Sequence, residues 1–335
     1  MNKSLISIIL PFKNTARYLP QCLNSIIAQT YNHWELLIVD DNSTDDSCQI
    51  VSFYAEKDNR IKLLRNEGSG IIDALKTAYK NGQGKLITRM DSDDVMHIEK
   101  LNMMHIDLEN NGQGHLALGL VKYFSKNGVG KGYKAYEDWL NKLTRTGQNF
   151  SEIYKECVIP SPCWMVHRSD FEKCGGFRSN IYPEDYDLAF RFYKNNLRCI
   201  PSKRILHYWR DHQSRASRTS EHYKENSFIE LKINYFLELD YNKNKPLVVW
   251  GAGKKGKKIA RLLLKLGIEF DWLCDNHKKI GKHIYDIKLR HFNELNSLKE
   301  PRIIIAVANF TEQNDIRDHL NRNHINTSED CFFFC

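Results

Sequence analysis

Three carboxylates follow a short apolar run early in the chain. Asp91, Asp93 and Asp94 lie within four residues, directly after the strand-like stretch 84–90. Carboxylates this close repel one another unless a cation or a helix end compensates their charge. Oxygen ligands of this kind suit Mg²⁺ or Mn²⁺, above all when a diphosphate supplies further oxygens. The alternative is an acidic turn that caps a helix beginning near His97, and the local sequence leaves both interpretations open.

Two further polar clusters also end strand-like runs. The three runs span residues 5–11, 34–39 and 84–90, and the helical stretches between them span residues 19–29, 47–57 and 71–81. Strands that alternate with helices at this spacing predict a parallel sheet with helices on both faces. Ligands bind such sheets beyond the carboxyl ends of the strands. We therefore expect residues 11–14, 40–42 and 91–94 to converge at one edge.

An acidic pair marks the start of a later helix. Glu184 and Asp185 follow Pro183 and precede an apolar run of helical period that contains Leu188 and Phe192. Acids in the first turn complement the positive end of the helix dipole. A carboxylate held there also stays ionised and can accept a proton, so a general base is compatible with the same position.

A basic loop follows the strand-like stretch 205–210. His212 lies close to Arg210, Arg215 and Arg218. Arg side chains match phosphate oxygens, and an imidazole can complete an oxygen-rich metal shell. The loop is either a site for a metal and a diphosphate or an exposed basic segment.

These motifs, in this order, resemble those of family-2 glycosyltransferases with the GT-A fold, over about residues 4–220. The resemblance implies an α/β fold with a mixed sheet flanked by helices, and an inverting transfer of a sugar from a UDP-sugar to an acceptor hydroxyl. Asp185 would be the catalytic base, with Glu184 beside it. Asp93 and His212 would bind Mn²⁺ or Mg²⁺. The nucleotide-sugar would contact Pro11, Phe12, Asn14, Asp41, Arg65, Asn66, Lys76, Asp91, Ser92, Asp93 and Arg215.

The sequence departs from the family pattern on the helix before the acidic cluster. Members commonly carry Ala-Arg-Asn or Ala-Leu-Asn there, whereas this chain has Ala74-Leu75-Lys76. Lys76 either replaces a lost phosphate contact or leaves that contact unmade, with Arg65 and Asn66 as nearby alternatives. The departure concerns donor recognition and not the class of enzyme.

The C-terminal part has a motif of its own. A strand-like run leads into Gly251, Gly253 and Gly256, a helix follows, and a second strand-like run ends in Asp275. This is the dinucleotide fingerprint in its usual context. It predicts a small Rossmann-like domain that holds a second nucleotide or phosphate, an NAD(P)-binding redox or regulatory module, or an accessory domain whose glycines only allow tight packing. The polar linker at 241–246 predicts domains at 1–240 and 241–335.

The order of these two parts also resembles glycosyltransferase-like proteins that modify queuosine in tRNA. The shared stretches are 139–143, 183–185 and 250–256. This resemblance implies tRNA as an alternative acceptor to a saccharide or a lipid-linked glycan. Of the formal charge of +8, residues 245–335 carry +5, from 16 Lys and Arg against 11 Asp and Glu. A basic part fits a nucleic acid, an anionic membrane surface or a solubilising face.

Apolar run lengths and cysteine spacing indicate the cellular compartment of the protein. No run approaches the roughly 20 apolar residues of a membrane span, and the apolar run at 5–10 is too short for a signal peptide. The nine cysteines include no CxxC pair, which favours reduced thiols. We expect a cytoplasmic protein, with peripheral contact at the inner face of the membrane as an option.

Overall fold

The computed structural model describes residues 4–178, 180–219, 228–323, 325 and 329–335. The chain forms two compact units, the first from Met1–Phe150 and Val158–Lys224 and the second from Ser151–Cys157 and Glu225–Cys335. It passes from the first to the second within the 3-10 helix η1 (Asn149–Glu152). The boundary expected at residues 240 and 241 falls inside the second unit, because helix α9 (Ile229–Leu239) belongs there.

The first unit is built on a seven-stranded mixed sheet of order β3-β2-β1-β4-β8-β6-β9. Its first four strands in this order are parallel, and β8 is antiparallel to both of its neighbours. The strands are β1 (Ile6–Phe12), β2 (Trp34–Asp40), β3 (Ile61–Arg65), β4 (Leu86–Arg89), β6 (His115–Leu118), β8 (Trp164–His167) and β9 (Arg198–Ile200).

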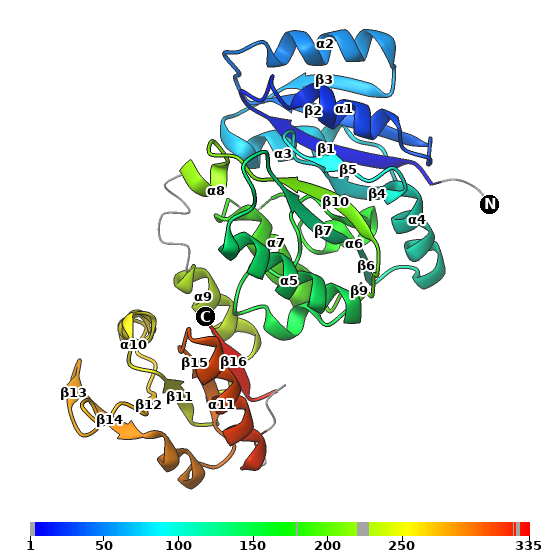
Figure 1. Cartoon of the computed structure of the whole chain (residues 1–335). Helices are drawn as coiled ribbons and strands as arrows, with labels where there is room; N and C mark the ends of the chain where they lie inside the picture. The colour runs from blue at the N-terminus through cyan, green and yellow to red at the C-terminus, as the bar shows by residue number, and fades with distance from the viewer. Residues whose placement is uncertain (1–3, 179, 220–227, 324, 326–328) are drawn as a thin grey trace. The chain divides into compact units, whose positions relative to one another are not determined.

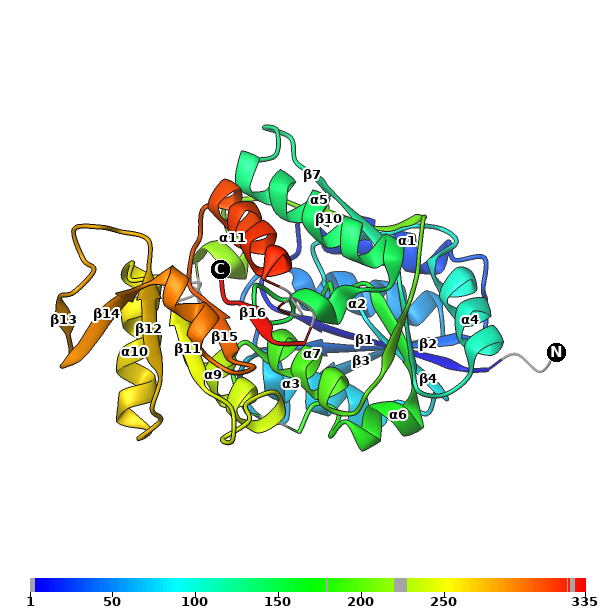
Figure 2. The same cartoon turned by 90° about the horizontal axis from the view of Figure 1, so that it is seen from below.

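Helices cover both faces of this sheet, so its central strands are buried and mostly apolar. Every residue of β1 and β2 is buried, as expected for a parallel sheet between two helical layers. Figure 2 shows α1 and α4 on one side of the sheet and α3, α6 and α7 on the other. These helices and α2 span Leu19–Ile27 (α1), Ser47–Lys57 (α2), Gly70–Asn81 (α3), Lys100–Asn111 (α4), Arg168–Lys173 (α6) and Glu184–Lys194 (α7).

A small second sheet of order β5-β10-β7 completes the first unit. Its strands are β5 (Val95–Met96), β7 (Leu120–Phe124) and β10 (Ile205–Arg210), and helix α5 (Lys131–Thr146) packs against β7. The short helix α8 (Ala216–Thr219) follows β10. Because β5 directly follows the acidic cluster and pairs with β10, this sheet connects that cluster to the basic loop.

The second unit contains a six-stranded sheet of order β13-β14-β12-β11-β15-β16. The strands are β11 (Leu247–Trp250), β12 (Asp271–Cys274), β13 (His283–Ile284), β14 (Ile287–His291), β15 (Arg302–Ile305) and β16 (Cys331–Phe333). All neighbours are parallel except β13 and β14, which form a hairpin at one edge (Figure 1). The parallel order is that of a doubly wound sheet, with β11 at its centre.

Helices also cover the sheet of the second unit. Ile316 and Leu320 of α11 (Phe310–Arg322) pack with Val248 and Trp250 of β11. Helix α10 (Lys254–Lys265) packs against β11 and α9 through an apolar face that includes Ile259. The 3-10 helix η3 (Phe292–Ser297) follows β14.

The predicted strands and helices of the N-terminal part are confirmed, with ends that differ by a few residues. Strand β3 and the 16-residue helix α5 were not expected from the sequence. Within the described part of the chain, no helix has the length and apolar character needed to cross a bilayer.

Candidate active site

The carboxyl ends of β1, β2 and β4 meet at one edge of the first sheet. Pro11 pairs in register with Val39, Phe12 with Asp40, and Ile9 with Arg89. The polar clusters that follow these strands therefore adjoin, as the topology predicted. Pro11 and Phe12 are buried at the strand end, so their backbone shapes this edge more than their side chains do.

Asp41 organises one side of this edge. Its Oδ1 accepts hydrogen bonds from the Asn66 side-chain amide at 2.7 Å and from the Gly70 backbone N–H at 2.8 Å. Lys13 approaches its Oδ2 at 3.4 Å. Asp41 is 6% exposed, and its carboxylate joins the loops after β1, β2 and β3. Asp41 and Asn66, both expected at the nucleotide, thus lie together.

Asn14 links the loops after β1 and β2. It has a φ of 52°, and its side-chain oxygen accepts a hydrogen bond from the Thr44 backbone N–H at 2.7 Å. Its own N–H donates to Ser43 Oγ at 3.0 Å. Asn tolerates this left-handed conformation better than most residues. Asn14 therefore shapes the loop, and its side-chain oxygen is already engaged.

Arg65 and Lys76, the two cations expected near the diphosphate, have different surroundings. Arg65 ends β3 opposite Asp40 and is exposed. Lys76 of α3 donates to Asn180 Oδ1 at 2.5 Å and approaches Asp73 at 3.4 Å. Both of these partners lie outside the Asp41 cluster.

Asp93 and His212 lie against each other, although 119 residues separate them. Their Oδ2 and Nε2 atoms share a hydrogen bond of 2.8 Å, and Ser214 Oγ contacts the other ring nitrogen at 2.9 Å. Burial opposes ionisation of Asp93, but the His212 hydrogen bond and the Arg215 charge outweigh it and lower the pKa of Asp93. The carboxylate is thus kept ionised, as a metal ligand must be.

Asp94 holds Asp93 and His212 in place through contacts with β10, a role that the sequence did not reveal. Its Oδ1 accepts the Arg210 backbone N–H at 2.7 Å, and its Oδ2 shares a hydrogen bond of 2.9 Å with His207 Nε2. The side chains of Asp94 and His207 are almost completely buried. Burial and the neighbouring charge of Asp93 raise the pKa of Asp94 well above its ordinary value. Asp94 ties the acidic loop to β10, which leads to His212.

Arg89 connects the acidic loop with the start of α7. Its Nη1 donates to Glu184 Oε1 at 2.9 Å, and its Nε donates to Asp91 Oδ1 at 3.0 Å. All three side chains are at least partly buried, and Arg89 and Glu184 are less than 10% exposed. The predicted residues Asp91 and Glu184 are therefore joined by a residue that sequence reasoning missed. Its position two residues before Asp91 on a buried strand was the available signal.

Asp185 differs from Glu184 in its surroundings. Burial, and then the adjacent charge of Glu184, raise the pKa of Asp185 to about 7, while the Arg89 charge opposes this shift. The Asp185 carboxylate also accepts the backbone N–H of Tyr186 at 2.8 Å. A general base is most effective when its pKa is near the working pH.

Several buried polar atoms at this site have no partner among the described residues, and two of them belong to charged side chains. These two are Oε2 of Glu184 and Nη1 of Arg215. Arg215 lies over the ring of Tyr123 at 5.6 Å and close to that of Trp209 at 5.8 Å. A buried donor or acceptor without a partner costs free energy, so these atoms are suited to polar groups of a ligand. Ser92 is also buried, between the two aspartates of the loop.

A divalent metal fits the donor set of Asp93 and His212. One carboxylate oxygen and one imidazole nitrogen lie within 2.8 Å of each other. In the described ranges no group of three or more His, Cys, Asp or Glu side chains could hold a metal. Mg²⁺ and similar ions are often held by one or two protein ligands, with phosphates and water completing the shell.

Comparison with known proteins identifies the family. A model of glycosyl transferase family 2 matches residues 7–175, about half of the 335 residues. The chain belongs to glycosyl transferase family 2. The matched region contains β1, β2, β4 and the acidic cluster, and the mixed sheet flanked by helices is that of the GT-A fold.

Several family-2 relatives are similar over different lengths. WfgD of Escherichia coli, a UDP-Glc:alpha-D-GlcNAc-diphosphoundecaprenol beta-1,3-glucosyltransferase, is 30% identical over 248 residues, which are 73% of this chain and 89% of WfgD. An uncharacterised glycosyltransferase of Rickettsia conorii is 28% identical over 185 residues, 55% of this chain and 28% of the relative. The chain thus spans little more than a quarter of this relative and of a similar one from Rickettsia felis.

A solved structure supports the fold. TarS of S. aureus, residues 1–349 in complex with UDP-GlcNAc, aligns with a TM-score of 0.54 and 21% identity, covering 77% of this chain and 71% of that chain. At this identity, the likeness concerns the fold alone.

The glycine motif of this family-2 chain lies at the carboxyl end of β11. Gly251 has a φ of +118°, and a Cβ at Gly256 would collide with the Gly251 carbonyl oxygen. These two glycines therefore allow α10 to pack closely on β11. A Cβ at Gly253 would meet nothing within 4 Å, and Asp275 is exposed just after β12. A second nucleotide or phosphate site here stays a prediction.

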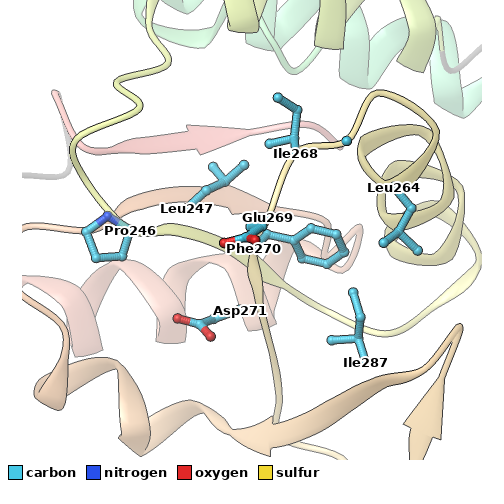
Figure 3. A pocket seen from close by; sticks show the side chains of 9 residues that line it. Pro246, Leu247, Leu264, Ile268, Glu269, Phe270, Asp271 and Ile287 are labelled. Carbon is cyan, nitrogen blue, oxygen red and sulfur yellow. The ribbon is translucent and has the colours of Figure 1, made fainter.

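A pocket of about 600 Å³ lies elsewhere in the second unit. Figure 3 shows Leu247, Leu264, Ile268 and Phe270 among the side chains that line it. It lies where β11 and β12 begin, whereas doubly wound sheets bind nucleotides where their strands end. This pocket is therefore distinct from the glycine motif.

Proposed function

We propose that the first unit transfers a sugar from a UDP-sugar to an acceptor hydroxyl with inversion, assisted by Mn²⁺ or Mg²⁺. The observation that carries this proposal is the pairing of two arrangements at one sheet edge. One is the contact between Asp93 and His212 at 2.8 Å. The other is the partly buried Asp185 beside the Arg89–Glu184 ion pair.

Asp185 acts as the general base. Its carboxylate takes the proton of the acceptor hydroxyl while the hydroxyl oxygen forms a bond to the anomeric carbon. The bond between that carbon and the diphosphate oxygen breaks, and its electron pair leaves with UDP. A single displacement inverts the configuration, in contrast to enzymes that use a second carboxylate as nucleophile.

The other residues of the site bind and orient the donor. Asp41 and Asn66 hold the loops against the base of the nucleotide, and Asp91 lies where β4 ends, within reach of the ribose. Arg215 directs its unpartnered Nη1 to a phosphate oxygen, and Glu184 offers Oε2 to a sugar hydroxyl. Asp93 and His212 hold the metal, which when bound stabilises the negative charge of the leaving diphosphate.

The acceptor is a saccharide, and a lipid-linked glycan in surface polysaccharide synthesis fits best. The support is similarity to WfgD, whose name specifies a diphosphoundecaprenol-linked acceptor and a UDP-Glc donor. The chain covers 89% of WfgD, so the similarity includes most of that enzyme. The identity of the donor sugar is left to experiment.

Replacing Asp185 by Asn tests the proposal. General-base catalysis contributes about 10²–10⁴-fold, so Asp185→Asn should lower kcat by that factor and leave UDP binding within twofold. Since the raised pKa penalises the ionised carboxylate, the variant should also gain stability. The gain is on the order of 2–4 kcal/mol above pH 7, shrinks between pH 7 and 4, and is absent below pH 4.

Kinetics measure kcat, calorimetry measures UDP affinity, and thermal unfolding at pH 8 and pH 4 measures stability. Asp187→Asn is unsuitable as a control because Asp187 is fully buried and pairs with Arg191. Asp138→Asn is the suitable control, because Asp138 on α5 is 66% exposed and its ion pair with Lys134 lies at the surface, so it should leave all three unchanged. Wild-type turnover in Asp185→Asn would refute the assignment of the base.

A further inference from the structure

Helix α10 of the second unit carries a row of cations on its outer face. Apart from the adjacent pair Lys257 and Lys258, successive members of the row are three or four residues apart, which places them along one side of an α-helix. The row, called the basic face below, consists of Lys254, Lys257, Lys258, Arg261 and Lys265, all exposed. The opposite side of α10 is apolar and buried against β11 and α9. The basic face is about 16 Å long at 1.5 Å per residue.

Helix α10 contains no acidic residue that could balance its cations. No Asp or Glu occurs between Gly251 and Ile268. Among the described residues, Lys254, Lys257 and Lys265 make no ion pair, and Arg261 donates to the neutral Tyr285 hydroxyl at 2.7 Å. Like charges four residues apart destabilise a helix by a few tenths of a kcal/mol per pair. A polyanionic surface would remove that repulsion.

Two exposed apolar side chains lie at the C-terminal end of α10. Leu264 is 40% exposed and Leu266 is 45% exposed. Leu264 also lines the pocket at the start of β11 and β12, together with Ile268 and Phe270 (Figure 3). Of the two carboxylates at this pocket, Asp271 is paired with Arg290, and Glu269 is exposed beyond the helix end.

We propose that the basic face and these leucines bind the surface of an anionic lipid bilayer. Lysines along a helix attract acidic headgroups, and exposed leucines beside them can enter the boundary between headgroups and acyl chains. A nucleic acid would use the cations but leaves Leu264 and Leu266 without a role.

Vesicle binding by the full chain tests this surface and does not depend on the transferase activity. The wild type should co-sediment with phosphatidylcholine vesicles that contain 30% phosphatidylglycerol, and not with pure phosphatidylcholine. Lys257→Gln, Lys258→Gln and Lys265→Gln combined should lower the partition coefficient on the order of 100-fold, since each cation contributes about fivefold. Leu264→Ser with Leu266→Ser should weaken binding severalfold and leave only its salt-sensitive part.

The matched control removes the same charge from another part of the second unit. Lys278, Lys282 and Lys288 are exposed and lie outside α10, so their triple Gln variant should bind within about threefold of the wild type. Equal losses in the two triple variants would overturn the proposal, as would no binding of the wild type to anionic vesicles. Tight binding of an RNA duplex that depends on the basic face, without vesicle binding, would assign the face to nucleic acid instead.

Discussion

Glu184 and Asp185 are adjacent acids whose surroundings give them different chemistry. Arg89 neutralises Glu184 through a contact of 2.9 Å. Asp185 has no such ion pair among the described residues, and burial together with the Glu184 charge raises its pKa to about 7. The charged groups that act on Asp185 are Glu184 and Asp91, which raise its pKa, and Arg89, which lowers it. Activity should therefore fall as the pH decreases through about 7.

Variants of Glu184 and Arg89 should shift the acidic limb of the pH profile of kcat/KM in opposite directions. Glu184→Gln removes a negative charge, lowers the pKa of Asp185 and shifts the acidic limb of kcat/KM by about one unit to lower pH. Arg89→Met removes a positive charge and shifts the limb by about one unit to higher pH. Profiles of kcat/KM between pH 5 and 9 measure both shifts.

The Arg89 variant leaves Glu184 buried without its partner and should cost about 3–5 kcal/mol of stability. If the Arg89→Met variant does not fold, the shift measured in Glu184→Gln still tests the assigned electrostatics. Lys62→Met, which removes an ion pair with Glu35 on β2, is the control and should leave the limb in place. Shifts of the same sign in the two test variants would contradict the assigned electrostatics.

At the scale of elements, apolar runs made the central strands predictable. Polar and charged residues within strand β3 and helix α5 concealed these two elements. Strand β3 alternates Ile61 and Leu63 with the charged Lys62 and was overlooked. Helix α5 buries three polar side chains, Glu137, Asn141 and Thr144. Asn141 accepts a hydrogen bond from the N–H of Val121 and donates one to its carbonyl. Such polar positions interrupt the apolar period from which a helix is recognised.

The site was predictable in part for the same reason. Motif positions such as Asp91 and Asp185 follow strands or begin helices, so their types and places could be read from the sequence. The contacts of Arg89 with Glu184 and of Asp94 with His207 join residues 95 and 113 positions apart. Side-chain pairing over such separations depends on the folded sheet, and local patterns do not contain it.

The glycine motif of the second unit yields a prediction at the same scale. Gly256→Ala should destabilise the unit by several kcal/mol, because its Cβ would meet the Gly251 carbonyl and packed backbone cannot relax cheaply. Gly253→Ala should cost less than about 1 kcal/mol, because the added Cβ meets nothing within 4 Å. Thermal unfolding of the two variants measures the difference. Equal losses would show that packing is not what distinguishes these glycines.

At the scale of the whole molecule, the second unit includes a segment from the middle of the chain. The Tyr154 ring stacks on Phe334 at 5.2 Å, and its hydroxyl donates to Asp240 at 2.5 Å. Arg317 donates to Glu152 at 2.6 Å. The segment 151–157 therefore depends on residues near the C-terminus for its order.

Truncation after residue 240 should expose this segment. The shortened chain loses Phe334 and Arg317, so trypsin should cleave after Lys155 at least tenfold faster than in the full chain. Limited proteolysis followed by mass spectrometry measures the rates, and Lys155→Gln in the shortened chain identifies the cut. Unchanged resistance at Lys155 would contradict this dependence.

Release of UDP from a panel of UDP-sugars, with and without Mn²⁺, tests the central claim most directly. The wild type should release UDP from one preferred donor in a metal-dependent manner, and Asp93→Asn should reduce the rate at least 100-fold. Asp138→Asn should behave as the wild type. Release at the same rate in the presence of a chelator, or an undiminished rate in Asp93→Asn, would contradict metal-assisted transfer at this site.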